Sequence, residues 1–189
     1  MRAYLKFVAT GSMFATVEEF LTIVVLRRDI GSYIFTLLIL FPIFLTFVWF
    51  SSRLIDRFFP TRPKQELAHF FIFGGIGLLM EWFLMGLAPW SNPAANPIAM
   101  LIFQLGMFSF WATVAFAPRL FSNPDENSQR CRREVLRFYT PYFVIVYLIA
   151  FVVAANLRFV TIILSILFGY LFLNVFYVRY FVRAVREVR

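Results

Sequence analysis

An apolar stretch with a carboxylate about halfway along occurs twice in this chain, and each copy is long enough to cross a bilayer. The second copy follows the first at an offset of 63 residues. The matched positions are Lys6-Phe7 and His69-Phe70, Gly11 and Gly74, Glu18 and Glu81, and Phe20-Leu21 and Phe83-Leu84. An ionisable side chain at bilayer depth costs at least ~2.5 kcal/mol on insertion scales, so it is a functional candidate by default. Two carboxylates at matched positions predict a duplicated, membrane-spanning unit with Glu18 and Glu81 at its functional centre.

The composition of the chain is that of a membrane protein. Hydrophobic residues make up 61% of the 189 residues, whereas a water-soluble domain is about 45–50% apolar. The formal net charge of +8 would also suit a nucleic-acid-binding protein. However, the basic residues cluster at the ends of the apolar runs, where membrane topology requires them. We therefore predict membrane lipids as partners and no nucleic acid.

Six segments are long enough to cross a hydrocarbon core of about 30 Å, which requires about 20 helical residues. They are residues 4–26, 32–52, 67–88, 97–118, 138–155 and 159–178. Fifteen of the 18 Lys and Arg residues lie near the chain ends or in the polar connections 53–66 and 119–137; the other three are Arg27, Arg28 and Arg158. By the positive-inside rule, we predict an all-α, polytopic protein of the cell (inner or plasma) membrane with both termini in the cytoplasm.

The chain is predicted to form one membrane domain, residues 1–189, built from three helical hairpins. The first two hairpins, residues 4–55 and 67–121, share the duplicated pattern. The third, residues 137–181, begins with Arg137-Phe138 but lacks the Gly and the Glu. It is either a divergent third copy or a pair of helices whose inner ends carry an aromatic residue and a cation for topological reasons. Because the units are helix pairs, all would enter the membrane in the same orientation.

Small and polar residues form one stripe on each of two helices. Gly11, Ala15, Glu18 and Thr22 are spaced by four, three and four residues, and Gly74, Gly77 and Glu81 form a comparable stripe. Such stripes allow close helix approach and are expected to face the bundle interior. At 1.5 Å per residue, both carboxylates would lie roughly 10–12 Å below the outer surface. The predicted substrate-binding or proton-carrying residues around this outer pocket are Glu18, Glu81, Gln104, Arg158, Glu19, Trp82 and Trp111.

A purely structural role for the carboxylates stays open at this point. One of them could be protonated and hydrogen-bonded to Gln104, to Thr22 or to a main-chain carbonyl, and so join two helices. Familiar catalytic sets are missing from the sequence. The chain has one cysteine, Cys131, and one histidine, His69, which is too few for a zinc cluster or a disulfide. We predict no cofactor, no metal and no catalytic residue, and lean against an enzyme.

The first two hairpins, residues 1–121, resemble the GtrA-like family of small membrane proteins. The resemblance rests on Phe7 and Gly11 near the start of the first span, and on Phe70 and Gly74 near the start of the third. It implies four helices in two similar halves and an association with the movement of lipid-linked sugars across a membrane. The second span ends in Arg53-Leu54-Ile55, without the Asn-rich ending of that family, and the third hairpin has no counterpart there.

Three functions fit these features. The first is a small transporter or flippase with a polar intramembrane pocket for a lipid-linked or otherwise amphipathic substrate. The second is a membrane-embedded enzyme in which a glutamic acid protonates a lipid or isoprenoid in a dry pocket. The third is an accessory subunit whose glutamates pair with cations on another membrane protein. The first is our main hypothesis, and a homo-oligomer or a partner subunit is compatible with each of them.

Overall fold

The computed structural model describes residues 1–91 and 96–186, and all of their regular structure is helical. The first hairpin contains α1 (Arg2–Glu19), η1 (Phe20–Leu26), α2 (Ile30–Phe35), η2 (Thr36–Leu40) and α3 (Phe41–Phe58). The second contains α4 (Arg62–Leu84), the short η3 (Pro89–Ser91) and α5 (Pro97–Ser122). The third consists of α6 (Glu126–Val152) and α7 (Ala155–Arg186). Because η1 continues α1, and α2 and η2 continue into α3, these elements form six long rods.

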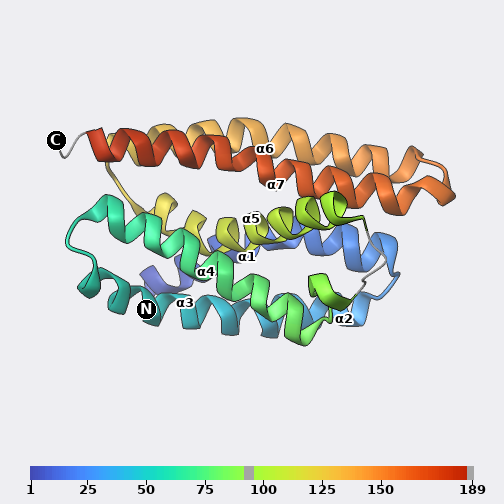
Figure 1. Ribbon diagram of the computed structural model, residues 1–189, viewed down its shortest axis with the longest axis horizontal. Coiled ribbons are helices and arrows are strands. Elements are labelled where there is room, and N and C mark those ends of the chain that lie inside the picture. The colour runs from blue at the N-terminus through green and yellow to red at the C-terminus, as the bar shows by residue number, and fades with distance from the viewer. Residues whose placement is uncertain (92–95, 187–189) are drawn as a thin grey trace.

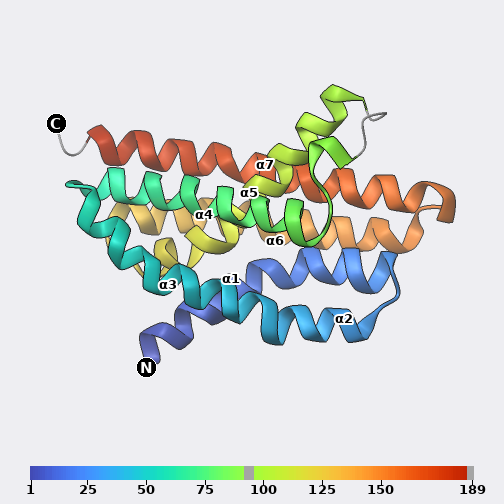
Figure 2. The ribbon, with the colours of Figure 1, turned by 60° about the horizontal axis from the view of Figure 1, so that its bottom comes forward.

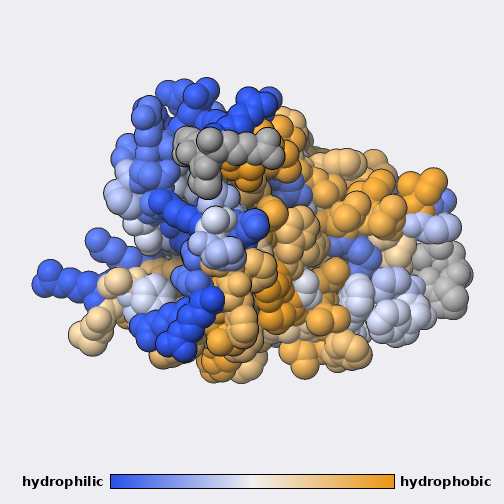
Figure 3. Space-filling view, turned by 60° about the vertical axis from the view of Figure 1, so that its left-hand side comes forward, coloured by the Kyte–Doolittle hydropathy of each residue, from blue (hydrophilic) through white to orange (hydrophobic). Residues whose placement is uncertain are grey.

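All six rods are long and apolar enough to cross a membrane, with mean hydropathy from 1.4 to 2.3 over their most apolar windows. The prediction of an all-helical protein with six helices able to span a membrane is therefore confirmed for the described residues, and six such helices indicate a multi-pass membrane protein. The surface agrees with it. Figure 3 shows hydrophilic residues gathered at one end of the molecule and a broad hydrophobic band beside them.

The rods lie roughly parallel, and the third hairpin covers one side of the other two (Figure 1). Helix α1 packs against α3 and α5, α5 packs against α4 and α7, and α6 pairs with α7. Helix α1 begins and α7 ends at the same end of the bundle, and the view in Figure 2 agrees. The turns from η1 to α2 and from α6 to α7 lie at the opposite end.

The helices extend further at the termini-bearing end than their apolar segments predict. Residues 53–66 and 119–137 were expected to be long connections, but only 59–61 and 123–125 lie outside the helices there. The fifth helix begins at Glu126 instead of residue 138 because Asp125 caps it, accepting a hydrogen bond from the Ser128 amide at 2.8 Å. Hydropathy marks the part of a helix that faces lipid, whereas caps of this kind mark where the helix begins.

The two small-residue stripes face the interior, as expected. Gly11, Ala15 and Glu18 are buried on α1, and Gly74, Gly77 and Glu81 are buried on α4. Helix α4 approaches α5 so closely that a Cβ added at Gly77 would lie 2.2 Å from Trp111 Cγ. This close packing fixes the level of α4 against α5 and thereby the position of Glu81.

The first hairpin departs from α-helical geometry in two places. Residues Phe20–Leu26 and Thr36–Leu40 are π-helical, with wider turns than an α-helix. The second segment lies just before Pro42. Proline lacks the amide that would bond to the carbonyl four residues earlier, and its ring crowds that carbonyl. Proline therefore accounts for the wider turns of η2, and nothing in the sequence of η1 explains its turns in the same way.

Candidate functional site

Three glutamates from two helices come together at the end of the bundle opposite to the chain termini. Glu18 and Glu19 are the last residues of α1, and Glu81 lies in the last turn of α4. Glu18 is only 9% exposed and Glu81 only 8%, while Glu19 is half-buried. Their side chains border two adjoining cavities, which we call together the glutamate pocket.

The two cavities share five lining residues and extend in different directions. The first, with a volume of about 320 Å³, lies among η1, α2, η2, α4 and α5. The second, of about 290 Å³, lies among η1, α4, α5 and α7. Each is near the lower end of the 300–1,000 Å³ range typical of small-molecule sites. The shared residues are Glu19, Ile23, Arg27, Glu81 and Met85.

The π-helical segment η1 builds one wall of the pocket. Glu19 immediately precedes it and Arg27 immediately follows it, and both line the two cavities together with Ile23. These three residues are spaced by four, so they lie on neighbouring positions of one side of the rod. Segments of this kind are rare and occur frequently at functional sites. Hydrophobic periodicity carries no signal for η1, so the sequence does not predict it.

Trp111 holds Glu81 in place. Its Nε1 donates a hydrogen bond to Glu81 Oε1 at 3.0 Å, and the Trp111 side chain lines the first cavity. The indole is 2% exposed and packs edge-on against Phe44 and tilted against Phe41. Trp111 therefore stands in the pocket wall with its one polar atom directed at a carboxylate.

Gln104 and Trp82 lie beside the glutamate pocket and bind to each other. Trp82 Nε1 donates to Gln104 Oε1 at 2.6 Å, and Gln104 Nε2 donates to the main-chain carbonyl of Leu87 at 3.0 Å. Neither side chain lines a cavity, whereas Leu87 lines the second one. This pair joins α4 to α5 and supports the chain that follows α4. Gln104 is therefore not the hydrogen-bond partner of a glutamate that we considered.

The arginine of the glutamate pocket is Arg27, and the expectation for Arg158 does not match the structure. Arg158 lies in the first turn of α7, and its Nη2 donates to the carbonyl of Val153 at 3.3 Å. It lines neither cavity, whereas Arg27 lines both. Arg158 is turned toward the end of α6 because the last carbonyls of that helix need donors.

In the part of the chain that the structure describes, these three carboxylates have no ionic partner. Among residues 1–91 and 96–186, none of the five ion pairs involves Glu18, Glu19 or Glu81. The Thr22 hydroxyl donates to the main-chain carbonyl of Glu18. Over the same part of the chain, no group of three or more His, Cys, Asp or Glu side chains is placed to hold a metal ion.

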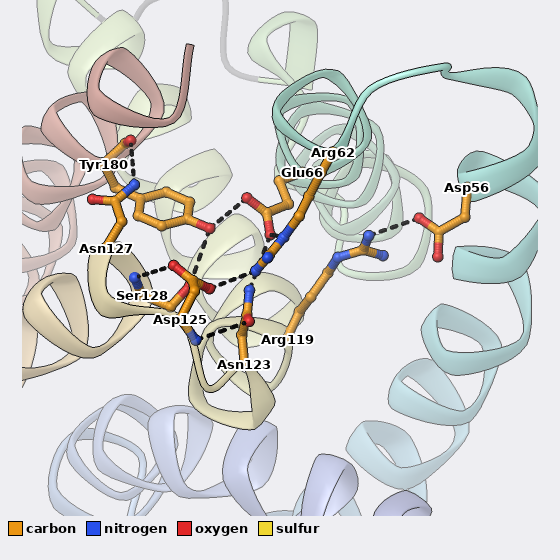
Figure 4. A network of polar contacts seen from close by, with 9 residues as sticks. All are labelled: Asp56, Arg62, Glu66, Arg119, Asn123, Asp125, Asn127, Ser128 and Tyr180. Carbon is orange, nitrogen blue, oxygen red and sulfur yellow. Dashed lines mark hydrogen bonds and ion pairs between the residues drawn. The ribbon is translucent and has the colours of Figure 1, made fainter. Parts of the chain in front are cut away.

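A second polar region lies at the opposite, termini-bearing end of the bundle (Figure 4). Arg119 pairs with Asp56 at 2.7 Å, and Arg62 pairs with Asp125 at 2.6 Å. Each pair joins residues 63 positions apart, the offset of the internal repeat. The first joins the ends of α3 and α5, and the second joins the starts of α4 and α6. The two pairs thus connect corresponding ends of successive hairpins.

The same region contains a buried carboxylate, Glu66. It is 2% exposed, pairs with Arg62 and accepts a hydrogen bond from the Tyr180 hydroxyl of α7. A cavity of about 460 Å³ lies beside it, bordered by Arg53, Arg62, Arg119, Asp56 and Glu66 among others. None of the predictions from the sequence included this network. The acidic residues within the otherwise basic connections 53–66 and 119–137 are the feature of the sequence that indicates it.

Asp125 is the best-defined titratable group outside the candidate spans. Partial burial raises the pKa of its carboxyl, but hydrogen bonds from Ser128 and the contact with Arg62 outweigh burial. The pKa of Asp125 therefore lies below its ordinary value, so the residue remains charged at neutral pH and holds the start of α6 against α4.

The fold and the site together define a six-helix, multi-pass membrane protein with a carboxylate-lined pocket between its helix ends. Comparison with protein-family models, with curated proteins and with solved structures finds no match for this chain.

Proposed function

We propose that this protein is a small transporter or flippase and that the glutamate pocket binds its substrate. One observation supports this most strongly: three carboxylates from α1 and α4 border cavities within helices that are otherwise apolar. Charged side chains at bilayer depth typically mark substrate or ion pathways. An amphipathic substrate, including a lipid-linked one, would place its polar group among Glu18, Glu19, Glu81 and Arg27, and its apolar part against the surrounding side chains.

We also propose that both termini face the cytoplasm of the cell membrane. The positive-inside rule favours this orientation, since 15 of the 18 Lys and Arg residues lie near the termini or in the two connections at that end. The glutamate pocket would then lie toward the outer surface, and the ion pairs of Asp56 and Asp125 would hold the hairpins together at the cytoplasmic surface. This is the arrangement of an outward-facing state, which transport requires to alternate with an inward-facing one.

Accessibility of a single cysteine tests this proposal without knowledge of the substrate. Cys131 is replaced by alanine, and Ile23, which lines both cavities, is replaced by cysteine. A membrane-impermeant maleimide is then applied to right-side-out and to inside-out vesicles. A transporter exposes its binding site alternately to the two sides, so Ile23→Cys should react from both.

Two further variants calibrate this experiment. Gly31→Cys, exposed in the first turn of α2, should react only from outside, and Glu126→Cys, exposed at the start of α6, only from inside. If Ile23→Cys reacts from one side only while both controls behave as described, transport through the pocket is excluded. An enzyme acting on a lipid or isoprenoid, or an accessory subunit, would then be the better account. If the two controls react from the reverse sides, the proposed orientation is wrong.

A further inference from the structure

The charges that line the glutamate pocket favour a positively charged ligand. Glu18, Glu19 and Glu81 face a single cation, Arg27, which is exposed and forms no ion pair in the described part of the chain. A buried charge is costly unless it is paired. A phosphate group entering the pocket would place negative charge beside three carboxyl groups, whereas a cation would pair with a carboxylate there.

Glu18 indicates most directly where this charge would be placed. Its side chain is about nine-tenths buried and lines the second cavity, and no cation of the described chain pairs with it. Glu81 differs, because Trp111 already donates a hydrogen bond to it. A buried carboxylate without a cationic partner therefore faces open space inside the protein.

The remaining walls suit a bulky and apolar cation. Aromatic side chains stand on several sides: Phe35 and Trp111 in the first cavity, and Phe103 and Phe159 in the second. Aromatic rings attract cations through their π-faces. Met80, Met85 and Met107 complete the lining, and methionine adapts to ligands of different shapes because its side chain is flexible and polarizable.

We propose that the glutamate pocket binds a lipophilic organic cation, such as a quaternary ammonium or phosphonium ion with aromatic or alkyl substituents. This inference rests on the proposed transport function and specifies its substrate class. The cationic centre lies between Glu18 and Glu81, the substituents fill the aromatic and methionine-lined ends, and Arg27 disfavours the binding.

Two probes of nearly equal shape and opposite charge test this assignment. Tetraphenylphosphonium and tetraphenylborate are each equilibrated with the purified protein in an uncharged detergent, and binding is measured by equilibrium dialysis against empty micelles. The phosphonium should bind and the borate should not. Because an ion pair in a partly hydrated site is lost, Glu18→Gln and Glu81→Gln should each weaken phosphonium binding about tenfold or more.

Two matched variants separate charge from misfolding. Glu126→Gln removes an exposed carboxylate at the far end of the bundle and should bind the phosphonium as the wild type does. Arg27→Gln should bind it more tightly, a gain that damage to the fold would not produce. Absence of phosphonium binding, equal binding of the borate, or unchanged binding by both glutamate variants would overturn the assignment.

An anionic amphiphile supplies the contrary outcome. If dodecyl phosphate binds instead, and Arg27→Gln abolishes its binding, the substrate is an anion and the cation assignment is wrong. Transport itself would stand in that case, since the accessibility of Ile23→Cys from the two sides is measured without any ligand. If that cysteine reacts from one side only but the phosphonium binds, the pocket is a cation site of a protein that does not transport.

Discussion

Replacement of Gly77 by alanine should separate α4 from α5 and disturb the glutamate pocket. The added Cβ would lie 2.2 Å from Trp111 Cγ and 2.4 Å from Trp111 Cβ, whereas carbon atoms in contact are normally about 3.5–4.0 Å apart. Because Trp111 Cβ is attached directly to the backbone, a change of rotamer cannot move it away. The helices must move apart or the indole must leave its site.

The expected loss of stability has two parts. Overpacking of a well-packed interior typically costs about 1–3 kcal/mol. Displacement of Trp111 would also break its hydrogen bond to Glu81, and hydrogen bonds contribute about 0.5–1.5 kcal/mol each. Removal of a helical glycine offsets about 1 kcal/mol of this loss, so we expect the free energy of unfolding to fall by about 2 kcal/mol. A protein of this size loses roughly 2–4 °C in Tm per kcal/mol, so the Tm should fall by about 4–8 °C.

Gly75→Ala is the matched control, because a Cβ added at Gly75 meets no atom within 4 Å. Both glycines lie within α4, so each substitution removes one helical glycine, which by itself favours the helix by about 1 kcal/mol. Thermal unfolding of both variants and the wild type is followed by circular dichroism in one detergent. Gly75→Ala should melt at or above the wild-type temperature. Equal Tm values for Gly77→Ala and Gly75→Ala would refute the close approach of α4 and α5.

Three further predictions concern the network at the opposite end. The folded-state pKa of Asp125 is depressed. Its contribution to stability is therefore present above the unfolded-state pKa of about 3.9 and is lost as pH falls through the lower folded-state value. Asp125→Asn should lower the Tm at neutral pH, and its Tm should approach that of the wild type in acid. Asp56→Arg and Arg119→Asp should each destabilise the protein. The double variant should recover about 0.2–1 kcal/mol in a double-mutant cycle of unfolding, since this ion pair is partly exposed. Absence of any recovery would mean that the pair does not form. Tyr180→Phe removes a hydrogen bond to the buried Glu66 and should lower the free energy of unfolding by about 1–3 kcal/mol. Tyr33→Phe, on the partly exposed α2, should change the free energy of unfolding by much less in the same denaturation assay.

The number of candidate spans and the buried faces of α1 and α4 could be predicted because both follow from composition and spacing. A run of about 20 apolar residues has few alternatives to a transmembrane helix, and small residues repeated at helical spacing mark close approaches such as that of Gly77. The helix ends could not be predicted in this way. Residues 126–137 are polar, yet they form the first turns of α6, since Asp125 caps the helix and Asn127 and Ser128 bond to Tyr180. Those contacts come from α7, more than 50 residues away.

The proximity of Glu18 to Glu81 followed from the repeat, but the cation beside them did not. Arg27 directly follows the first apolar segment, 4–26, so the sequence places it in the short connection after that span. In the structure the helical rod runs through η1 to Leu26, and Glu19, Ile23 and Arg27 all line the pocket. Arg158 was the reasonable alternative at the same end of the bundle, but it is used to bond the end of α6. The charge balance of the pocket, and with it the class of ligand that the pocket can accept, therefore depends on how the end of the first rod folds, which hydrophobic periodicity does not encode.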